Sequence, residues 1–190
     1  MSIYYPSSNC GGGSIPAYYC NPCLDSSTIE YGRIRSIALI KNSYINTVLA
    51  NPTSSSVWST GISNANIIVI YLTQGSYDGG VTGELTGFGD SATYNGNTTH
   101  TLTYKDPFSA DNCDFYNAIR NSTDYTIAFR TSSKVWFAEE PCTFTPKNAV
   151  ADDINSAMAW EVGVKWTNSD SPCGYDTPSG IFDSCYIDIP

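Results

Sequence analysis

The clearest pattern in the chain is a strict alternation of apolar and polar positions near its C-terminal end. From Met158 to Trp166 every second residue is Met, Trp or Val, while Glu161 and Lys165 lie at positions between them. This period of two is the spacing of side chains on one face of a β-strand. It predicts a strand with one buried face, and Trp160 lies in the buried register.

Three other segments have the pattern of strands. Residues 33–41 alternate at first and become apolar on both faces in their second half. Residues 67–72 are apolar throughout and rich in β-branched side chains, which is typical of a strand covered on both sides and favours a central place in a sheet. Residues 125–130 and 134–139 flank a Thr-Ser-Ser segment and predict an antiparallel hairpin.

Local signals add a turn and two short helices. The Asn-Gly pair at residues 95–96 suits a type I′ turn, so a β-hairpin is expected around it. The Asn-Pro-Thr-Ser segment at residues 51–54 can begin a helix that carries Trp58 on its apolar face. Residues 109–118 form a second candidate helix, capped by a serine at its first position.

Together these elements predict an all-β fold. Strands separated by turns, with one or two short helices, are typical of an antiparallel β-sandwich or barrel. The composition changes only near the two ends, where Gly, Pro, Ser and Cys accumulate. We therefore expect an irregular Gly/Cys-rich arm over residues 1–27, a β-rich body over residues 28–170, and a C-terminal extension over residues 171–190 that packs on the body.

Composition narrows the class of protein. Of the 190 residues, 41% are hydrophobic and 14% are charged, which is enough apolar surface for a core and too little charge for a disordered chain. With 9 Lys and Arg against 18 Asp and Glu, the formal net charge is −9. No apolar run is long enough to span a membrane, and the scattered cations disfavour nucleic acid as a partner. Proteins, glycans and metal ions remain as expected partners.

The start of the chain and its cysteines favour synthesis in the cytoplasm. Residues 1–7 have neither the basic segment nor the apolar segment of a secretory signal. The 7 cysteines form an odd set, which a secreted domain held together by disulfides would rarely carry. Reduced thiols, with or without a metal ion, are therefore the expected state.

The most specific chemical motif is a pair of cysteines, Cys20 and Cys23, separated by two residues. This spacing allows both thiolates to bind one tetrahedral metal ion, but a complete zinc site needs two more ligands. The predicted ligands are Cys20, Cys23, Cys10 and Cys185, with Cys142 or Cys173 as alternatives for the fourth. Free thiols or a disulfide are the alternatives to zinc. A redox role is disfavoured, because the motif lies in a Pro/Gly-rich arm rather than at a strand-to-helix junction.

The sequence contains no complete set of catalytic residues, so the chain is not expected to be an enzyme. His100 is the single histidine and lies on a half-apolar strand face, which is typical of a packed residue rather than a general base. Residues 87–92 match a dinucleotide-binding glycine pattern, but a hairpin rather than a helix is expected after them. The acidic pairs at 139–140 and 152–153 are interpreted as solvated, because adjacent strand residues face opposite ways.

Aromatic residues make a carbohydrate-binding β-sandwich module the alternative from another class. The chain has 14 Tyr and 4 Trp, and flat rings exposed on a sheet can stack against sugars. Three of the tryptophans are expected in the core from their registers. Trp136, Tyr94 and Tyr104 are the rings for which a binding role stays open.

Several short segments point to one class of protein. They are Cys-Asn-Pro-Cys at 20–23, Glu-Tyr-Gly-Arg-Ile-Arg at 30–35, Tyr-Leu-Thr-Gln-Gly-Ser-Tyr-Asp-Gly at 71–79, Gly-Phe-Gly at 87–89, His-Thr-Leu-Thr-Tyr at 100–104, Asp-Phe-Tyr-Asn at 114–117, Trp-Glu-Val at 160–162 and Lys-Trp at 165–166. Taken together over roughly residues 20–185, the chain resembles small structural proteins from the virions of tailed bacteriophages that infect Bacteroides-like hosts, including the crAss-like group.

The resemblance implies a non-enzymatic component of the phage particle. Its first form is an auxiliary capsid (decoration) protein, and a tail or connector component is the nearest variant. The implied partners are other virion proteins, namely capsid subunits and copies of the chain itself, and the implied location is the virion after synthesis in the host cytoplasm. No catalytic or cofactor-binding residue follows from the resemblance. The charge of −9 favours an outer surface over contact with the genome.

Overall fold

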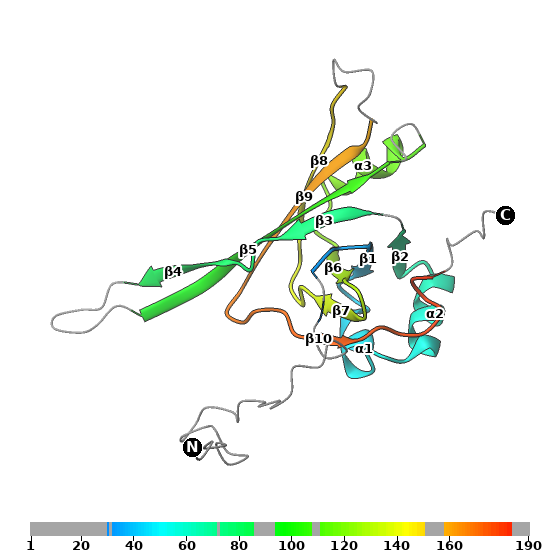
Figure 1. Ribbon diagram of the computed structural model, residues 1–190, viewed down its shortest axis with the longest axis horizontal. Helices are drawn as coiled ribbons and strands as arrows, with labels where there is room; N and C mark the ends of the chain where they lie inside the picture. The colour runs from blue at the N-terminus through cyan, green and yellow to red at the C-terminus, as the bar shows by residue number, and fades with distance from the viewer. Residues whose placement is uncertain are drawn as a thin grey trace, which may run out of the picture. The chain divides into compact units, whose positions relative to one another are not determined.

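The computed structural model describes residues 30, 32–71, 73–85, 94–107, 111–150 and 158–183, with the backbone alone at 94 and 95. The chain divides into two units, Met1–Glu30 and Tyr31–Pro190, and the description below concerns the second. The described part of this unit contains ten strands in two antiparallel sheets and three short helices (Figure 1). The predicted antiparallel β-sandwich is therefore confirmed, and the sheets are not closed into a barrel.

The first sheet has the strand order β10-β7-β6-β1-β2. Its strands are β1 (Ser36–Lys41), β2 (Ile67–Ile70), β6 (Tyr125–Arg130), β7 (Lys134–Phe137) and β10 (Gly174–Asp176). β1 is an interior strand of this sheet and pairs with β6 on one side and β2 on the other. Its residues are apolar on both faces, as expected for a strand covered on both sides. Helices α1 (Ile45–Ala50) and α2 (Ser55–Ser63) follow β1 along the chain, and α2 packs against β2.

The second sheet has the strand order β3-β5-β9-β8. The long strand β5 also pairs with β4: residues 94–99 of β5 pair with β4, and residues 102–105 pair with β3. Its strands are β3 (Gln74–Tyr77), β4 (Val81–Leu85), β5 (Tyr94–Asp106), β8 (Thr143–Asn148) and β9 (Trp160–Asn168). The helix α3 (Cys113–Ile119) follows β5 and packs near β8. None of the described helices is long and apolar enough to cross a membrane.

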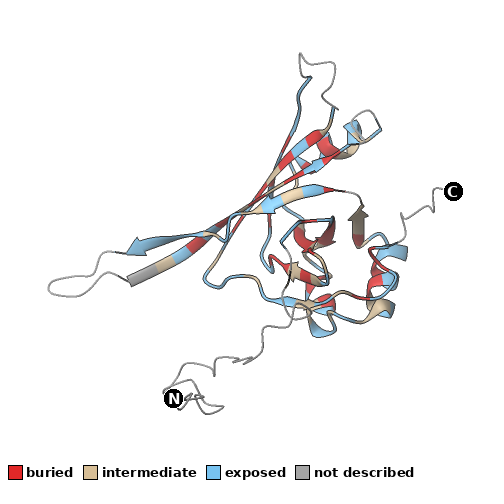
Figure 2. Cartoon of the chain, in the orientation of Figure 1, coloured by how far each residue is buried: buried red, intermediate tan, exposed pale blue. Residues whose placement is uncertain are grey.

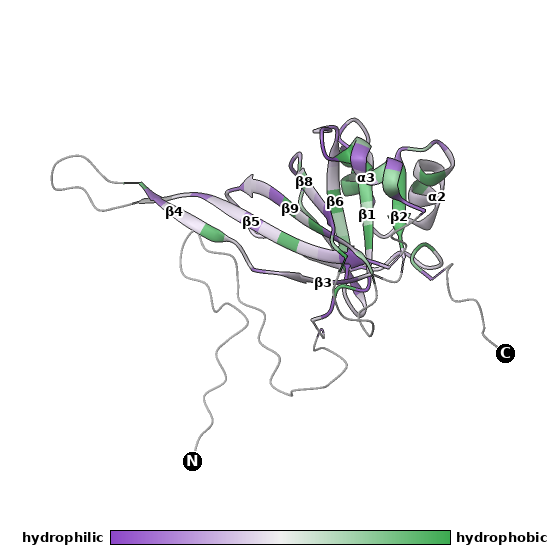
Figure 3. Ribbon diagram, turned by 90° about the horizontal axis from the view of Figure 1, so that it is seen from above, coloured by the Kyte–Doolittle hydropathy of each residue, from purple (hydrophilic) through white to green (hydrophobic). Residues whose placement is uncertain are grey.

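The first sheet has a hydrophobic core on each of its faces. Its interior strands β1 and β6 are almost entirely buried (Figure 2). The core shared with the second sheet includes Ile37, Leu39, Leu102, Tyr104, Tyr116, Phe129, Phe144, Trp160, Val162, Val164 and Trp166. The core on the opposite face includes Ala38, Ile40, Val48, Trp58, Ile67, Phe137, Ile181 and Phe182. The alternating residues of β1 thus serve both cores, which agrees with the hydrophobic character of β1, β2 and β6 (Figure 3).

Residues that follow β10 close the second core. Ile181 and Phe182 are buried, and the ring centroid of Phe182 lies 5.2 Å from that of Trp58. Arg130 at the end of β6 forms an ion pair of 2.9 Å with Asp183. Residues 181–183 therefore pack on the first sheet.

Several predicted elements are confirmed. β9 has the expected alternation, with Trp160 and Trp166 buried and Glu161 exposed. β6 and β7 form the expected antiparallel hairpin, and α2 begins after Ser54 with Trp58 buried. α3 begins at Cys113, later than expected; the predicted cap at 109 lies outside the described residues.

The prediction that residues 67–72 form a central strand is wrong. β2 lies at the edge of the first sheet, where only β1 pairs with it among the described strands. Its apolar sequence has another cause, because helix α2 packs against this strand and Ile67 contributes to the second core. An edge strand that a helix covers can have the same apolar sequence pattern as a central strand.

The predicted turn at Asn95-Gly96 is also wrong. Both residues lie within β5, where Asn95 pairs with Glu84 of β4, so they do not form the turn. Gly96 allows close approach of the strands, because an added β-carbon would lie 3.1 Å from the carbonyl oxygen of Gly83. The glycine is needed for this contact and not for a positive φ angle.

Candidate functional site

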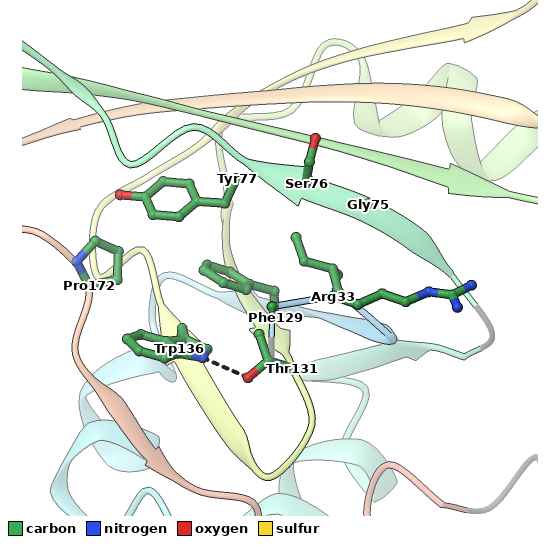
Figure 4. A pocket seen from close by; sticks show the side chains of 10 residues that line it. Arg33, Gly75, Ser76, Tyr77, Phe129, Thr131, Trp136 and Pro172 are labelled. Carbon is green, nitrogen blue, oxygen red and sulfur yellow. Dashed lines mark hydrogen bonds between the residues drawn. The ribbon is translucent and has the colours of Figure 1, made fainter. Parts of the chain in front are cut away.

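A cleft of about 380 Å³ opens where the two sheets approach each other (Figure 4). It is bounded by the residues before β1, by β3, by the ends of β6 and β7, and by the segment before β10. Its lining includes Arg33, Ile34, Gly75, Tyr77, Phe129, Thr131, Trp136 and Pro172. The volume lies at the lower end of the range for small-molecule sites.

Three aromatic rings form most of the apolar wall of this cleft. The rings of Phe129 and Trp136 are nearly parallel, with an interplanar angle of 10° and centroids 6.4 Å apart. The Tyr77 ring lies across from them, with its centroid 5.5 Å from that of Phe129. The indole N–H of Trp136 donates a hydrogen bond of 3.0 Å to Thr131 Oγ1, which fixes the ring. The wall can therefore receive a flat or apolar group without first rearranging.

Polar groups of the cleft lie at its rim. Arg33 and Ser76 are exposed, and Figure 4 shows the guanidinium of Arg33 pointing away from Tyr77 and Trp136. The apolar stem of Arg33 lines the cleft instead. The chemistry available in the interior is thus stacking and apolar contact, with no described charge directed into it.

Behind the cleft, Tyr77 belongs to a stack with His100 and Trp166. The His100 and Trp166 rings are 5.1 Å apart at 16°, and the Tyr77 hydroxyl lies 2.7 Å from His100 Nδ1. Burial raises the pKa of Tyr77 to about 12, and the nearby carboxylate of Asp78 adds to this shift. His100 is fully buried, and its Nε2 has no hydrogen-bond partner among the described residues. This agrees with the interpretation of His100 as a packed residue.

A second polar cluster joins α3 to the end of β5. The Tyr116 hydroxyl donates a hydrogen bond of 2.7 Å to Asp106 Oδ2, and Asn112 donates one of 2.9 Å to the same oxygen. Burial raises the pKa of both Tyr116 and Tyr104, which lies fully buried in the same core. The binding role left open for Tyr104 is therefore wrong: its ring is part of the core. The cluster positions α3 and closes this end of the sandwich.

The most exposed regular element is the two-stranded ribbon formed by β4 and residues 94–99 of β5, which we call the β4–β5 ribbon. All five residues of β4 are exposed, with 70% exposure at Val81 and 61% at Leu85. β9 pairs with β5 only from Thr98 onward, so the outer part of the ribbon extends past the second sheet (Figures 1 and 3). Exposed strand edges of this kind can accept another strand.

The predicted zinc ligands cannot be placed in the fold. Cys10, Cys20, Cys23 and Cys185 all lie outside the described residues, as do residues 87–92 and 152–153. Among the residues that the structure describes, no group of three His, Cys, Asp or Glu side chains is arranged to hold a metal ion. Residues 139 and 140 are exposed, which agrees with their interpretation as solvated acids.

The described cysteines differ in their suitability as a fourth zinc ligand. Cys142 is buried, and burial raises the pKa of its thiol to about 12. Its Sγ also lies 3.4 Å from the carbonyl oxygen of Glu140, so this side chain is not suited to metal binding. Cys173 is exposed and is the alternative that stays open.

Sequence reasoning missed the cleft because its wall comes from separate segments of the chain. Only Trp136 carried a signal, since its register did not assign it to the core. The backbone alone is described at Tyr94, the other ring for which a binding role stays open. The exposed apolar residues Val81 and Leu85 gave no comparable signal, because β4 is short and has no buried face.

Comparison with known proteins gives no relative. The chain matches no protein-family model, no curated protein sequence and no solved structure.

Proposed function

We propose that the chain is a non-enzymatic structural subunit of a bacteriophage virion, an auxiliary capsid protein that binds neighbouring virion proteins through the β4–β5 ribbon. The observation that carries the proposal is the full exposure of β4, including Val81 and Leu85. An exposed edge that carries apolar side chains is an aggregation hazard in a free subunit. It has a use in an assembly, where a neighbour covers it.

The charge of the chain favours one side of the capsid. A net charge of −9 repels packaged nucleic acid and suits an outer surface or a basic partner. The sandwich supplies a stable body, and the ribbon carries contacts beyond it. This division is compatible with a decoration protein and, as the variant, with a tail or connector component.

The experiment compares incorporation of charged variants into particles. Val81→Lys combined with Leu85→Lys places two charges on the ribbon, at positions where both side chains are largely exposed. Thr143→Lys combined with Thr145→Lys makes the same change in charge on exposed positions of β8. We expect both variants to fold, and only the ribbon variant to be lost from purified particles. Wild-type protein that is absent from particles would refute the proposal.

The cleft supports a second candidate function, a carbohydrate-binding module. The half-buried rings of Trp136 and Tyr77 both pack on the buried ring of Phe129 and offer a surface on which a sugar face could stack. Titration of the protein with a panel of bacterial glycans tests this candidate. Saturable binding that Trp136→Ala abolishes, without loss of thermal stability, would favour it over the virion role.

A further inference from the structure

We infer that the partner of β4 is β4 of a second copy of the chain, paired antiparallel about a two-fold axis at Gly83. This inference rests on the proposed function, because it names one partner of the assembly surface. It is carried by three features of the β4–β5 ribbon: a free edge, a regular backbone and a sequence pattern that is symmetric about Gly83.

The free edge of β4 contrasts with the other outer strands. β4 pairs with β5 on one side and with no described strand on the other. β8 carries Pro146 and Lys147, residues that discourage pairing at an edge, while α2 packs against β2. β3 is bridged to Ile34, and β10 has only three residues. β4 has none of these protections apart from the single charge of Glu84.

The backbone of β4 is regular where a partner would pair. The register with β5 shifts between Thr82 and Glu84, which pair with Thr98 and Asn95. Two steps along β4 therefore lie opposite three steps along β5, so the extra residue of this bulge belongs to β5. The outer edge of β4 keeps the spacing that a second strand requires.

The sequence selects one register for pairing with a second copy. Centring the axis at Gly83 pairs all five residues, placing Val81 opposite Leu85 of the second copy and Thr82 opposite its Glu84. A shift of the axis to Glu84 would place two carboxylates directly opposite each other, which is unfavourable. A shift to Thr82 would remove both contacts between Val81 and Leu85. The register at Gly83 therefore combines the most backbone pairs with apolar contacts and no directly opposed like charges.

A second copy also satisfies the symmetry of the surface. The order of side chains in β4 is apolar, polar, glycine, polar, apolar, and it is the same when read in reverse. A second copy of β4 running antiparallel therefore places apolar residues opposite apolar residues and polar residues opposite polar residues. Pairing of identical patches about a two-fold axis is the commonest way in which soluble proteins form dimers. A ladder of five residues is short, and we expect weak association in solution that the high local concentration within a particle strengthens.

Disulfide trapping tests the pairing directly. A β-carbon at Gly83 would meet only the carbonyl oxygen of Asn97, at 3.6 Å, so Gly83→Cys is compatible with the fold. Directly opposed residues of antiparallel strands have Cα atoms about 4.5–5.5 Å apart, which is within disulfide range. We expect mild oxidation to give a dimer in which peptide mapping finds the 83–83 bond. Thr143→Cys, on the exposed face of β8, is the control.

Charge at position 82 gives a second test of the register. Added to Gly83→Cys, Thr82→Glu brings two carboxylates opposite each other twice per dimer, whereas Thr82→Lys forms two opposite-charge pairs. Both variants lose the same hydrogen bond to Thr98. We expect the glutamate variant to cross-link about tenfold more slowly than the lysine variant. Thr143→Glu and Thr143→Lys, each added to Gly83→Cys, should leave the rate of cross-linking unchanged.

The outcomes separate this inference from the proposed function. If Gly83→Cys cross-links no faster than Thr143→Cys, or if Glu and Lys at position 82 give equal rates, self-pairing is refuted. A chain that enters particles but cross-links there to another virion protein would refute self-pairing and leave the proposed function standing. A chain that dimerises through β4 but is absent from particles would refute the proposed function and leave self-pairing standing.

Discussion

The hydroxyl of Tyr77 lies 2.7 Å from Nδ1 of His100, and this contact connects the wall of the cleft to the core behind it. Tyr77 also packs against Phe129 of the first sheet, while His100 stacks on Trp166 of the second. The position of the cleft wall is thus coupled to the stack that joins the two sheets. The single histidine of the chain stabilises this arrangement.

Alkaline pH should reveal the burial of Tyr77. Because burial raises its pKa from 10.0 to about 12, the folded state favours the protonated hydroxyl. Its contribution to stability is fully present below pH 10 and is lost as the pH rises through about 12. Urea unfolding at pH 10 to 12 should show a smaller loss of stability in Tyr77→Phe than in the wild type. Equal pH dependence of both proteins would contradict the burial of this hydroxyl.

Gly79 and Gly80 are a matched pair of positions for testing the close approach of the backbone at Gly80 to the ring of His100. Both have positive φ, at 83° and 85°, so alanine at either position should cost about 1 kcal/mol in backbone strain. An added β-carbon at Gly80 would also lie 2.5 Å from His100 Nδ1, whereas at Gly79 it would meet nothing within 4 Å. Chemical denaturation should therefore find Gly80→Ala clearly less stable than Gly79→Ala. Equal stabilities would show that the stack does not depend on this approach.

Removal of a core tryptophan tests the face assignment of β9. Trp160 is buried, and its ring centroid lies 4.8 Å from that of Tyr116. We expect Trp160→Ala to lower the free energy of unfolding by about 3–5 kcal/mol. Glu161→Ala, at the next and exposed position, should change it by less than about 0.5 kcal/mol. The assignment fails if the two variants are equally stable.

Zinc binding is a prediction from the sequence alone, and metal analysis tests it. Protein made under reducing conditions should contain zinc at near-unit stoichiometry, and replacing Cys20 and Cys23 with Ser should remove it. Cys142→Ser should retain the zinc, because this thiol is buried beside Thr126. Wild-type protein that is folded and free of metal would leave free thiols or a disulfide as the state of these cysteines.

The sequence predicted those parts of the fold in which burial has a regular period. The alternation in β9 and the hairpin of β6 and β7 were found because one face of each strand packs on a core. The apolar sequence of β2 was read correctly as covered on both sides, yet its position at the edge depends on helix α2, which no local pattern specifies. The Asn95-Gly96 pair shows the same limit, because the approach of β4 determines its conformation.

The candidate surfaces were less predictable than the fold. The cleft brings Tyr77 of β3 to the end of the first sheet beside Trp136, and these residues are distant in sequence. Such a site depends on how two sheets meet, which a single sequence does not encode locally. β4 is short, contains a glycine and has no buried face, so it lacks the periodic signal by which the core strands were found.

An electron-microscopic reconstruction of purified particles will show whether this chain assembles into a phage particle, as we propose. We expect copies of the sandwich on the outer surface of the head, with β4 of each copy covered by a neighbouring protein. Density for the chain in which β4 is left exposed to solvent would exclude the proposed role of the β4–β5 ribbon. Particles that contain no copy of the chain would refute the proposed virion function.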